Sequence, residues 1–293
     1  MLGSEVRKTF GFRREPFVVR EADDVYLTRP MRRAAALVQD ALDMQGLIAV
    51  VGPVGCGKTT LVKWAFSGAR QSERYRIASP RTVDREHLTI GHIQESVILD
   101  LGHERPAKSR ESQARQIQKI LETLLEQGIQ PVLYVDEAQA INAHTLRCLK
   151  RLREHEYLYM PMLAVVLSGQ VGGADDLVRK LGGWDLLELS RRLEVVELGG
   201  LGRELKAYLE HKLTRVGGKA GLVDAGALRA LARNSDLPLH LDQLLTRAFR
   251  LAYERSEKRI TEDIIGELIN LGEPEETPVA EPAAAAGAAR HVA

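Results

Sequence analysis

The chain has 293 residues, of which 44% are hydrophobic and 28% charged, and its formal net charge is +1. This balance is typical of globular proteins and excludes a disulfide-stabilised miniprotein and a wholly disordered chain. Residues 273–293 contain four Glu and one Arg, which leaves only +4 on the rest, so overall charge does not by itself predict a nucleic-acid partner.

The N-terminus lacks the apolar stretch of a secretory signal, and no apolar run approaches the roughly 20 residues of a membrane-spanning helix. The cysteines Cys56 and Cys148 lie far apart and without metal-ligand spacing. We therefore expect a cytoplasmic protein with no membrane partner, no disulfide and no cysteine-bound metal.

Short apolar runs alternate with amphipathic helical patterns over the first two hundred residues, which favours a parallel sheet covered by helices. The expected strands are 47–51, 75–78, 131–135, 163–167 and 193–198, with a helix over 110–127 just before the central strand. Beyond residue 200 four helical patterns follow without strands, at 203–216, 224–234, 239–256 and 261–271.

These patterns predict four parts. They are an N-terminal extension (1–30), an α/β core (31–200), an all-helical domain (201–272) and a tail (273–293). We expect the tail to be disordered because its Pro, Ala and Glu residues bury too little apolar surface to offset the entropy of ordering.

A glycine-rich loop of the form GxxxxGK[ST] stands between the first predicted strand and a helical pattern, which is the context that a phosphate-binding loop requires. Its backbone N–H groups and the positive end of the next helix would bind the β-phosphate. Lys58 would bridge the β- and γ-phosphates, and Thr59 would ligate Mg²⁺. The predicted nucleotide-binding residues are Gly52, Pro53, Val54, Gly55, Cys56, Gly57, Lys58, Thr59 and Thr60.

Acidic and polar residues end two later strands. Placing two carboxylates at the end of a buried strand costs folding free energy, which suggests that they have a function. Asp136 is therefore predicted to hold Mg²⁺, and Glu137 to polarise the attacking water. Solvated acids at a strand end are the alternative. Ser168 and Gln170 follow the next strand and could sense the γ-phosphate or position water, although turn chemistry would also explain the Ser-Gly pair.

Two groups of basic residues lie outside these motifs. Arg191 or Arg192, just before the last core strand, could reach the γ-phosphate in a neighbouring subunit; surface pairing with nearby glutamates is the alternative. Arg147, Lys150 and Arg151 share one face of a predicted helix by i, i+3 and i+4 spacing. This stripe suits sequence-independent phosphate contacts with double-stranded DNA, and a solvated face paired with glutamates is the alternative.

Further short motifs run through the chain from about residue 10 to residue 270. They are Phe10-Gly11-Phe12, Glu15-Pro16-Phe17, Tyr26-Leu27, Asp136-Glu137-Ala138-Gln139, Gly169-Gln170, Arg247-Ala248 and Ala252-Tyr253. In these motifs the chain resembles the AAA+ ATPase group that includes ExeA of type II secretion and the transposition proteins TniB, TnsC and MuB.

The resemblance implies an α/β P-loop NTPase core of the AAA+ type with a C-terminal all-helical lid domain. It also implies ATP and Mg²⁺ as cofactors, ATP hydrolysis, and assembly into a ring or helical filament on duplex DNA. The function it implies is regulation of DNA transposition through target selection and transposase activation, with hydrolysis driving disassembly.

Two departures from the family pattern affect this reading. A Pro-Arg pair, whose arginine reaches the nucleotide from the lid, is Pro238-Leu239 here, which makes slow hydrolysis or switch-like behaviour more plausible. A Gln-Arg pair is Arg191-Arg192 here, which makes Arg192 the better candidate for an arginine finger. An ExeA-like ATPase for secretion-channel assembly and a nucleotide-gated scaffold or helicase-loader-like switch stay open as alternatives.

Overall fold

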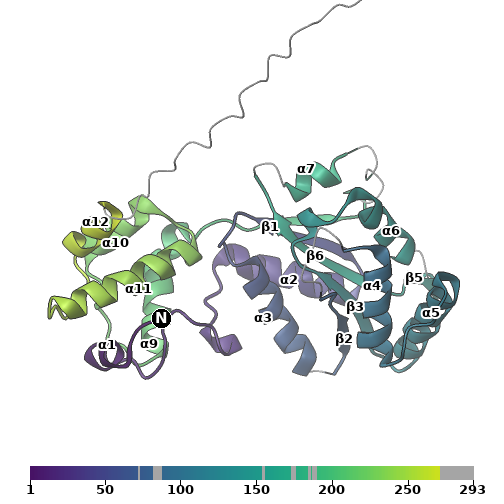
Figure 1. Ribbon diagram of the computed structural model, residues 1–293, viewed down its shortest axis with the longest axis horizontal. Coiled ribbons are helices and arrows are strands. Elements are labelled where there is room, and N and C mark those ends of the chain that lie inside the picture. Colours follow the sequence, from purple (N-terminus) through teal and green to yellow (C-terminus); the bar gives the residue numbers. More distant parts are fainter. Residues whose placement is uncertain are drawn as a thin grey trace, which may run out of the picture.

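The computed structural model describes residues 1–71, 73–81, 88–153, 156–172, 176–183, 186 and 190–270, and for residues 69–71, 150, 151 and 153 it describes the backbone alone. The tail expected to be disordered, 273–293, lies outside the described residues. Figure 1 shows two parts: an α/β core and a smaller group of helices beside it.

A sheet of five parallel strands forms the centre of the core in the described residues, in the order β2-β3-β6-β1-β7. Each strand expected from the sequence is present. The strands are β1 (Leu47–Gly52), β2 (Tyr75–Ala78), β3 (Gln130–Val135), β6 (Ala164–Gln170) and β7 (Glu194–Glu197).

Helices cover both faces of this sheet, which explains why every residue of β1 is buried. Leu47, Ala49 and Val51 belong to one hydrophobic cluster, whereas Ile48 and Val50 belong to another. This alternation follows from the two-residue period of a strand. The first cluster packs under α4 (Ile90–Val97), α5 (Arg110–Glu126), α6 (Ala143–Arg153) and α7 (Leu177–Leu181), and the second under α2 (Arg29–Asp43) and α3 (Lys58–Gln71).

Local sequence signals set the bounds of α5. The side chain of Ser109 accepts a hydrogen bond from the backbone of Ser112 and so caps the first turn. Beyond the other end, Gly128 takes a φ of +74°, which suits glycine and lets the chain turn toward β3. The predicted helix over 110–127 is therefore confirmed to within one residue.

The strand order fixes where a ligand can bind. From β1 the chain crosses to the far edge at β2 and returns through β3 and β6, so the connections leave β1 and β3 in opposite directions. In open α/β sheets, ligands bind at the carboxyl ends of the strands beside such a switch point. The loop after β1 and the residues after β3 and β6 meet there.

The helical part has its own core, built around the fully buried Phe249. The N-terminal segment also packs into this core, since the rings of Phe10 and Phe12 lie edge-on to Phe249 with centroids 4.9 and 5.2 Å apart. Its elements are α1 (Ser4–Phe10), α9 (Leu205–Arg215), α10 (Ala225–Asn234), α11 (Pro238–Glu254) and α12 (Glu262–Asn270). Helix α1 and the helices α9 to α12 thus share one hydrophobic core (Figure 1).

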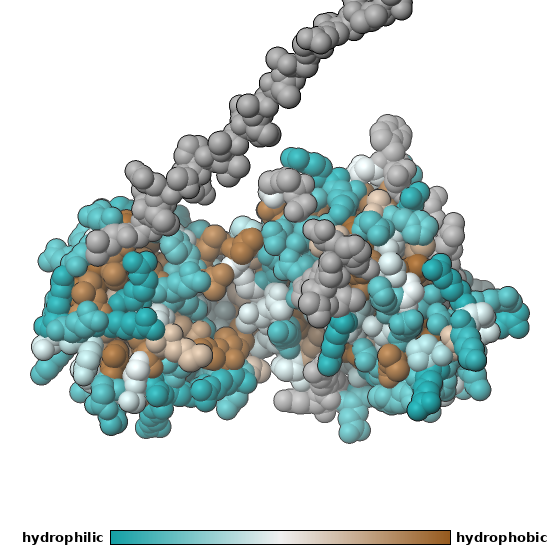
Figure 2. Space-filling view, in the orientation of Figure 1, coloured by the Kyte–Doolittle hydropathy of each residue, from teal (hydrophilic) through white to brown (hydrophobic). Residues whose placement is uncertain are grey.

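Short elements complete the described chain. They are the 3₁₀ turns η1 (Ala22–Asp24), η3 (Ala138–Ala140) and η5 (Gly202–Glu204), the π-helical η2 (Ile98–Gly102), and the hairpin strands β4 (Glu156–Tyr157) and β5 (Met160–Pro161). Figure 2 shows hydrophilic side chains over most of one face, with hydrophobic ones more frequent over the helical part. None of the helices in the described ranges is long and apolar enough to cross a membrane.

Candidate nucleotide site

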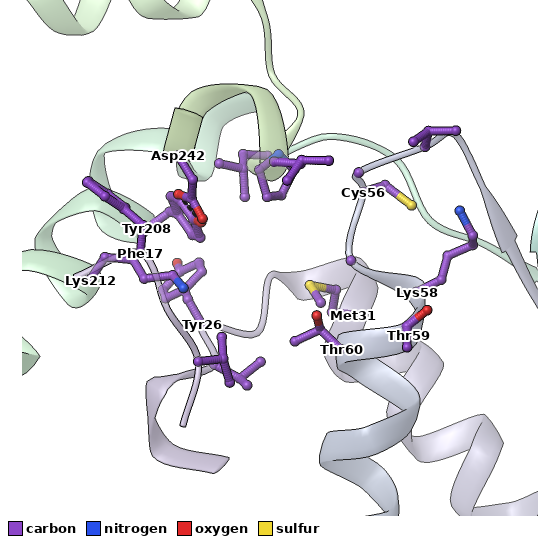
Figure 3. A pocket seen from close by; sticks show the side chains of 18 of the residues that line it. Phe17, Tyr26, Met31, Cys56, Lys58, Thr59, Thr60, Tyr208, Lys212 and Asp242 are labelled. Carbon is purple, nitrogen blue, oxygen red and sulfur yellow. Dashed lines mark hydrogen bonds between the residues drawn. The ribbon is translucent and has the colours of Figure 1, made fainter. Parts of the chain in front are cut away.

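A pocket of about 360 Å³ lies between the core, the N-terminal segment and the helical part. Figure 3 shows its residues in two groups. Lys58, Thr59 and Thr60 of the glycine-rich loop and α3 form one end, with Cys56 beside them. The lid residues Tyr208, Lys212 and Asp242, together with Phe17 and Tyr26 of the N-terminal segment, form the other.

The glycine-rich loop connects β1 to α3 and requires glycine for steric reasons. Gly55 has a φ of +83°, and a Cβ on it would lie 2.7 Å from the Cβ of Leu239. The side chain of Lys58 is only 7% exposed, and its Nζ donates to the carbonyl oxygens of Gly52 and Pro53, each at 2.9 Å. The loop therefore holds a buried ammonium group where a phosphate-binding loop needs its positive charge.

Thr59 lines the pocket, and Asp136 lies directly behind it. The Oγ1 of Thr59 lies 3.3 Å from both carboxylate oxygens of Asp136, and the backbone N–H of Glu137 donates to Oδ1 of Asp136 at 3.1 Å. A hydroxyl and a carboxylate are the kinds of oxygen donor that Mg²⁺ prefers. The two residues predicted to hold Mg²⁺ are thus adjacent, and their chemistry fits the ion.

Ser168 lies beneath Asp136 and is fully buried. Its hydroxyl donates to Oδ1 of Asp136 and also lies 3.1 Å from the hydroxyl of Tyr134. Burial raises the pKa of Tyr134 well above its usual value, so this phenol stays neutral. The contacts that Ser168 makes orient the carboxylate of Asp136, and its predicted role in sensing the γ-phosphate or positioning water stays a prediction.

Glu137 is held by two glutamine side chains. Its Oε2 accepts from the side chain of Gln139 and, at 3.1 Å, from Nε2 of Gln170, while the backbone N–H of Gln170 donates to Oε1 of Gln139 at 3.0 Å. Glu137 has a φ of +55°. This backbone conformation is energetically unfavourable for any residue other than glycine, and residues that adopt it cluster at functional sites. Glu137 and Gln170 both line the pocket, as the sequence predicts.

The lid touches the loop through its backbone. The N–H of Leu239 donates to the carbonyl of Gly55 at 3.2 Å, at the start of α11. The Leu239 side chain is 48% exposed and lines the pocket. The position where the family pattern has an arginine is therefore next to the loop, but here it carries an uncharged side chain.

The predicted basic residues lie outside the pocket lining. Arg191 and Arg192 are exposed just before β7, and Arg147 is exposed on α6. The side chains of Lys150 and Arg151, predicted to share a face with Arg147, lie outside what the structure describes.

Sequence reasoning missed the lid end of the pocket. Phe17 and Tyr26 lie in motifs that carry the family resemblance, but nothing in those motifs assigned them a role. Tyr208, Lys212 and Asp242 sit on amphipathic helices, where a buried polar residue has the same local sequence signature as a surface residue. Only the folding of the lid against the core brings them to the pocket.

Comparison with known proteins agrees with this geometry. Residues 41–178 match the family model described as an AAA domain. No curated protein gives a match. Aeropyrum pernix ORC2, in ADPNP–ADP complexes, superposes with a TM-score of 0.61 at 15% identity, over 89% of this chain and 72% of that one.

Two further solved structures are similar. The Aeropyrum pernix ORC1 protein in complex with DNA has a TM-score of 0.60 at 17% identity, over 89% of this chain and 69% of that one. A variant of Thermotoga maritima RuvB has a TM-score of 0.55 at 16% identity, over 87% of this chain and 73% of that one. The chain therefore has the P-loop AAA+ fold: a parallel sheet flanked by helices, followed by C-terminal helices.

Proposed function

We propose that this protein is an ATP-dependent, DNA-binding regulator of DNA transposition that assembles into oligomers with ATP and disassembles on hydrolysis. The observation that carries the ATPase part is that Lys58, Thr59 and Glu137 line one pocket, with Asp136 lying 3.3 Å from the hydroxyl of Thr59. The transposition part is supported by the motifs that the chain shares with the TniB, TnsC and MuB group.

Each of these residues has a distinct task in the proposed hydrolysis. Lys58 donates to the β- and γ-phosphate oxygens, and Thr59 and Asp136 hold Mg²⁺, which stabilises charge on the phosphates when bound. Glu137 accepts a hydrogen bond from the attacking water and then its proton. Gln170 keeps the Glu137 carboxylate at the pocket, as their 3.1 Å hydrogen bond supports.

The proposal that duplex DNA is a partner has two supports. Two of the similar structures are described as DNA complexes, the Aeropyrum pernix ORC1 protein and Drosophila ORC. Arg147 is exposed on α6 in this chain, as a phosphate contact requires. An exposed Arg192 before β7 is also available to a neighbouring subunit, which would make hydrolysis depend on assembly.

The experiment that tests the function is co-sedimentation and negative-stain imaging on random-sequence duplex DNA with ATP, a slowly hydrolysed ATP analogue, ADP or no nucleotide. We expect rings or filaments on DNA only with a triphosphate. The matched control is Lys58→Ala, which should abolish nucleotide binding and assembly together. Nucleotide binding without any DNA association at low salt would refute the DNA part of the proposal.

The DNA surface can be tested separately. Replacing Arg147, Lys150 and Arg151 together by alanine should weaken binding about equally for all sequences. The slope of log K against log salt is negative, and each lost phosphate contact reduces its magnitude by about 0.9, so the triple variant should reduce the magnitude by up to about 2.7. An unchanged slope would exclude this stripe as the contact surface.

A nucleotide-gated switch of the helicase-loader kind is the second candidate. It is favoured by the contact of Leu239 with Gly55, because an uncharged residue here gives the lid no arginine to place on the γ-phosphate. In this case the protein would bind ATP and change shape but hydrolyse it very slowly, even when assembled on DNA. Single-turnover hydrolysis on DNA distinguishes the two candidates.

A further inference from the structure

Two charged lid residues lie on the side of the pocket opposite Lys58 and Thr59 (Figure 3). Lys212 comes from α9 and is only 6% exposed, and Asp242 comes from α11. The hydroxyl of Tyr208 donates to Oδ1 of Asp242 at 2.6 Å, which leaves Oδ2 for another donor. Both charged residues line the same pocket as the glycine-rich loop.

The surroundings of Asp242 disfavour its charged form, even with Lys212 and Tyr208 nearby. Burial raises the pKa of Asp242 to about 6, and the charge of Lys212 only partly offsets this effect. Within the described residues Lys212 forms no ion pair and donates no hydrogen bond, and its Nζ lies 5.5 Å from the centroid of the Tyr208 ring. Lysine is seldom buried unless paired, and both the ammonium group of Lys212 and Oδ2 of Asp242 are free to contact a polar ligand in the pocket that the two residues line.

The shape of the pocket identifies that partner. A phosphate chain seated on Lys58 and Thr59 places the nucleoside toward the opposite end, where Phe17 and Tyr26 offer aromatic faces. An adenine base presents ring nitrogens that accept hydrogen bonds beside an exocyclic amino group that donates them. An ammonium and a carboxylate on one wall match this edge.

We propose that Lys212 and Asp242 are a specificity-determining pair that binds the edge of the adenine base, with Nζ donating to a ring nitrogen and Oδ2 accepting from the exocyclic amino group. The proposal rests on the ATP-binding part of the proposed function and deepens it. Because Leu239 carries no charge, the base and not the γ-phosphate then ties the lid to the core. ATP and ADP should therefore engage the lid pair equally.

The test compares nucleotide affinities of the purified full chain by calorimetry. Lys212→Met keeps most of the side-chain volume and removes the charge, and Lys206→Met, an exposed position on the same helix, is its matched control. We expect Lys212→Met to weaken the binding of ATP and of ADP by the same factor, roughly 10- to 100-fold. This is the loss of affinity expected when one hydrogen bond to a charged group is removed. Affinity for inorganic tripolyphosphate should not change, and Lys206→Met should bind all three like the wild type.

A ligand change tests Asp242 without depending on a variant that folds. Purine riboside triphosphate lacks the exocyclic amino group, so the wild-type protein should bind it roughly tenfold more weakly than ATP. Asp242→Asn should lose affinity for ATP but little for this analogue, which isolates the pairwise interaction.

Three results would overturn the inference. The first is that the wild type binds ATP and the purine analogue with equal affinity. The second is that Lys212→Met binds ATP as tightly as the wild type. The third is that Lys212→Met loses affinity for ATP and for tripolyphosphate by the same factor. The last would place Lys212 on the phosphates. A wild-type protein that binds neither ATP nor tripolyphosphate would instead refute the proposed function itself, so the two failures are distinguishable.

Discussion

Replacing Asp242 by asparagine should stabilise the nucleotide-free protein at neutral and alkaline pH. Burial raises the pKa of the Asp242 carboxyl to about 6 in the folded chain, from an ordinary value of 3.8. Ionising it therefore costs the folded state more than the unfolded state, and the asparagine side chain mimics the protonated acid. Tyr208 keeps an acceptor for its 2.6 Å hydrogen bond in the variant.

The magnitude and its sign follow from proton linkage. A raised pKa contributes stability below the unfolded value that is lost as the pH rises through the folded value. At 1.36 kcal/mol per pKa unit, the difference between about 6 and 3.8 predicts that the variant is more stable by about 3 kcal/mol at pH 8. The same relation gives about half of that at pH 5, because the folded wild type is then mostly protonated at Asp242.

Urea denaturation at pH 5 and pH 8 measures this difference. We expect the midpoint of Asp242→Asn to exceed that of the wild type at both values, by more at pH 8, with an unchanged slope. Asp263→Asn, at an exposed acid on α12, is the control and should differ by only a few tenths of a kcal/mol. A stability gain that does not grow from pH 5 to pH 8 would refute the reasoning.

Three other substitutions test the loop end of the site. Glu137→Gln should bind ATP normally but lower the hydrolysis rate by a factor of roughly 10² or more, which single-turnover kinetics would measure; unchanged turnover would contradict its role. Ser168→Ala should weaken Mg²⁺-dependent ATP affinity in calorimetry, because Asp136 loses an orienting donor. Gly55→Ala should lower the thermal midpoint and ATP affinity, since its Cβ would lie 2.7 Å from that of Leu239 at a φ of +83°; a wild-type midpoint would count against this packing.

The stability and binding predictions for Asp242 point in opposite directions. The same substitution that removes the cost of a buried charge should also remove a contact to the base. Such a trade-off is expected when a site keeps a destabilising group for its ligand. Measuring both quantities on one protein sample separates a binding role from a purely structural one.

The sheet and most of the phosphate end could be predicted because their signals are local. Runs of buried apolar residues mark the strands, and Gly55 and Lys58 occupy positions of a motif whose conformation is set by its own residues. Asp136 and Glu137 follow a strand directly, so parallel strand order brings them to the loop. The hydrogen bonds from Gln139 and Gln170 to Glu137 could not be predicted, because they depend on the register between β3 and β6.

The sequence by itself determined the fold class, the loop and the acids that face it, because these depend on spacing along the chain. Only the tertiary structure decided that the N-terminal aromatics and the lid helices close one pocket with that loop. Lys212 and Asp242 lie 154 and 184 residues beyond Lys58 in the sequence. Hydrophobic periodicity is a local signal, so it cannot predict that residues so far apart line the same pocket. Their approach is set by the packing of the lid and of α1 around Phe249, which is a property of the whole chain.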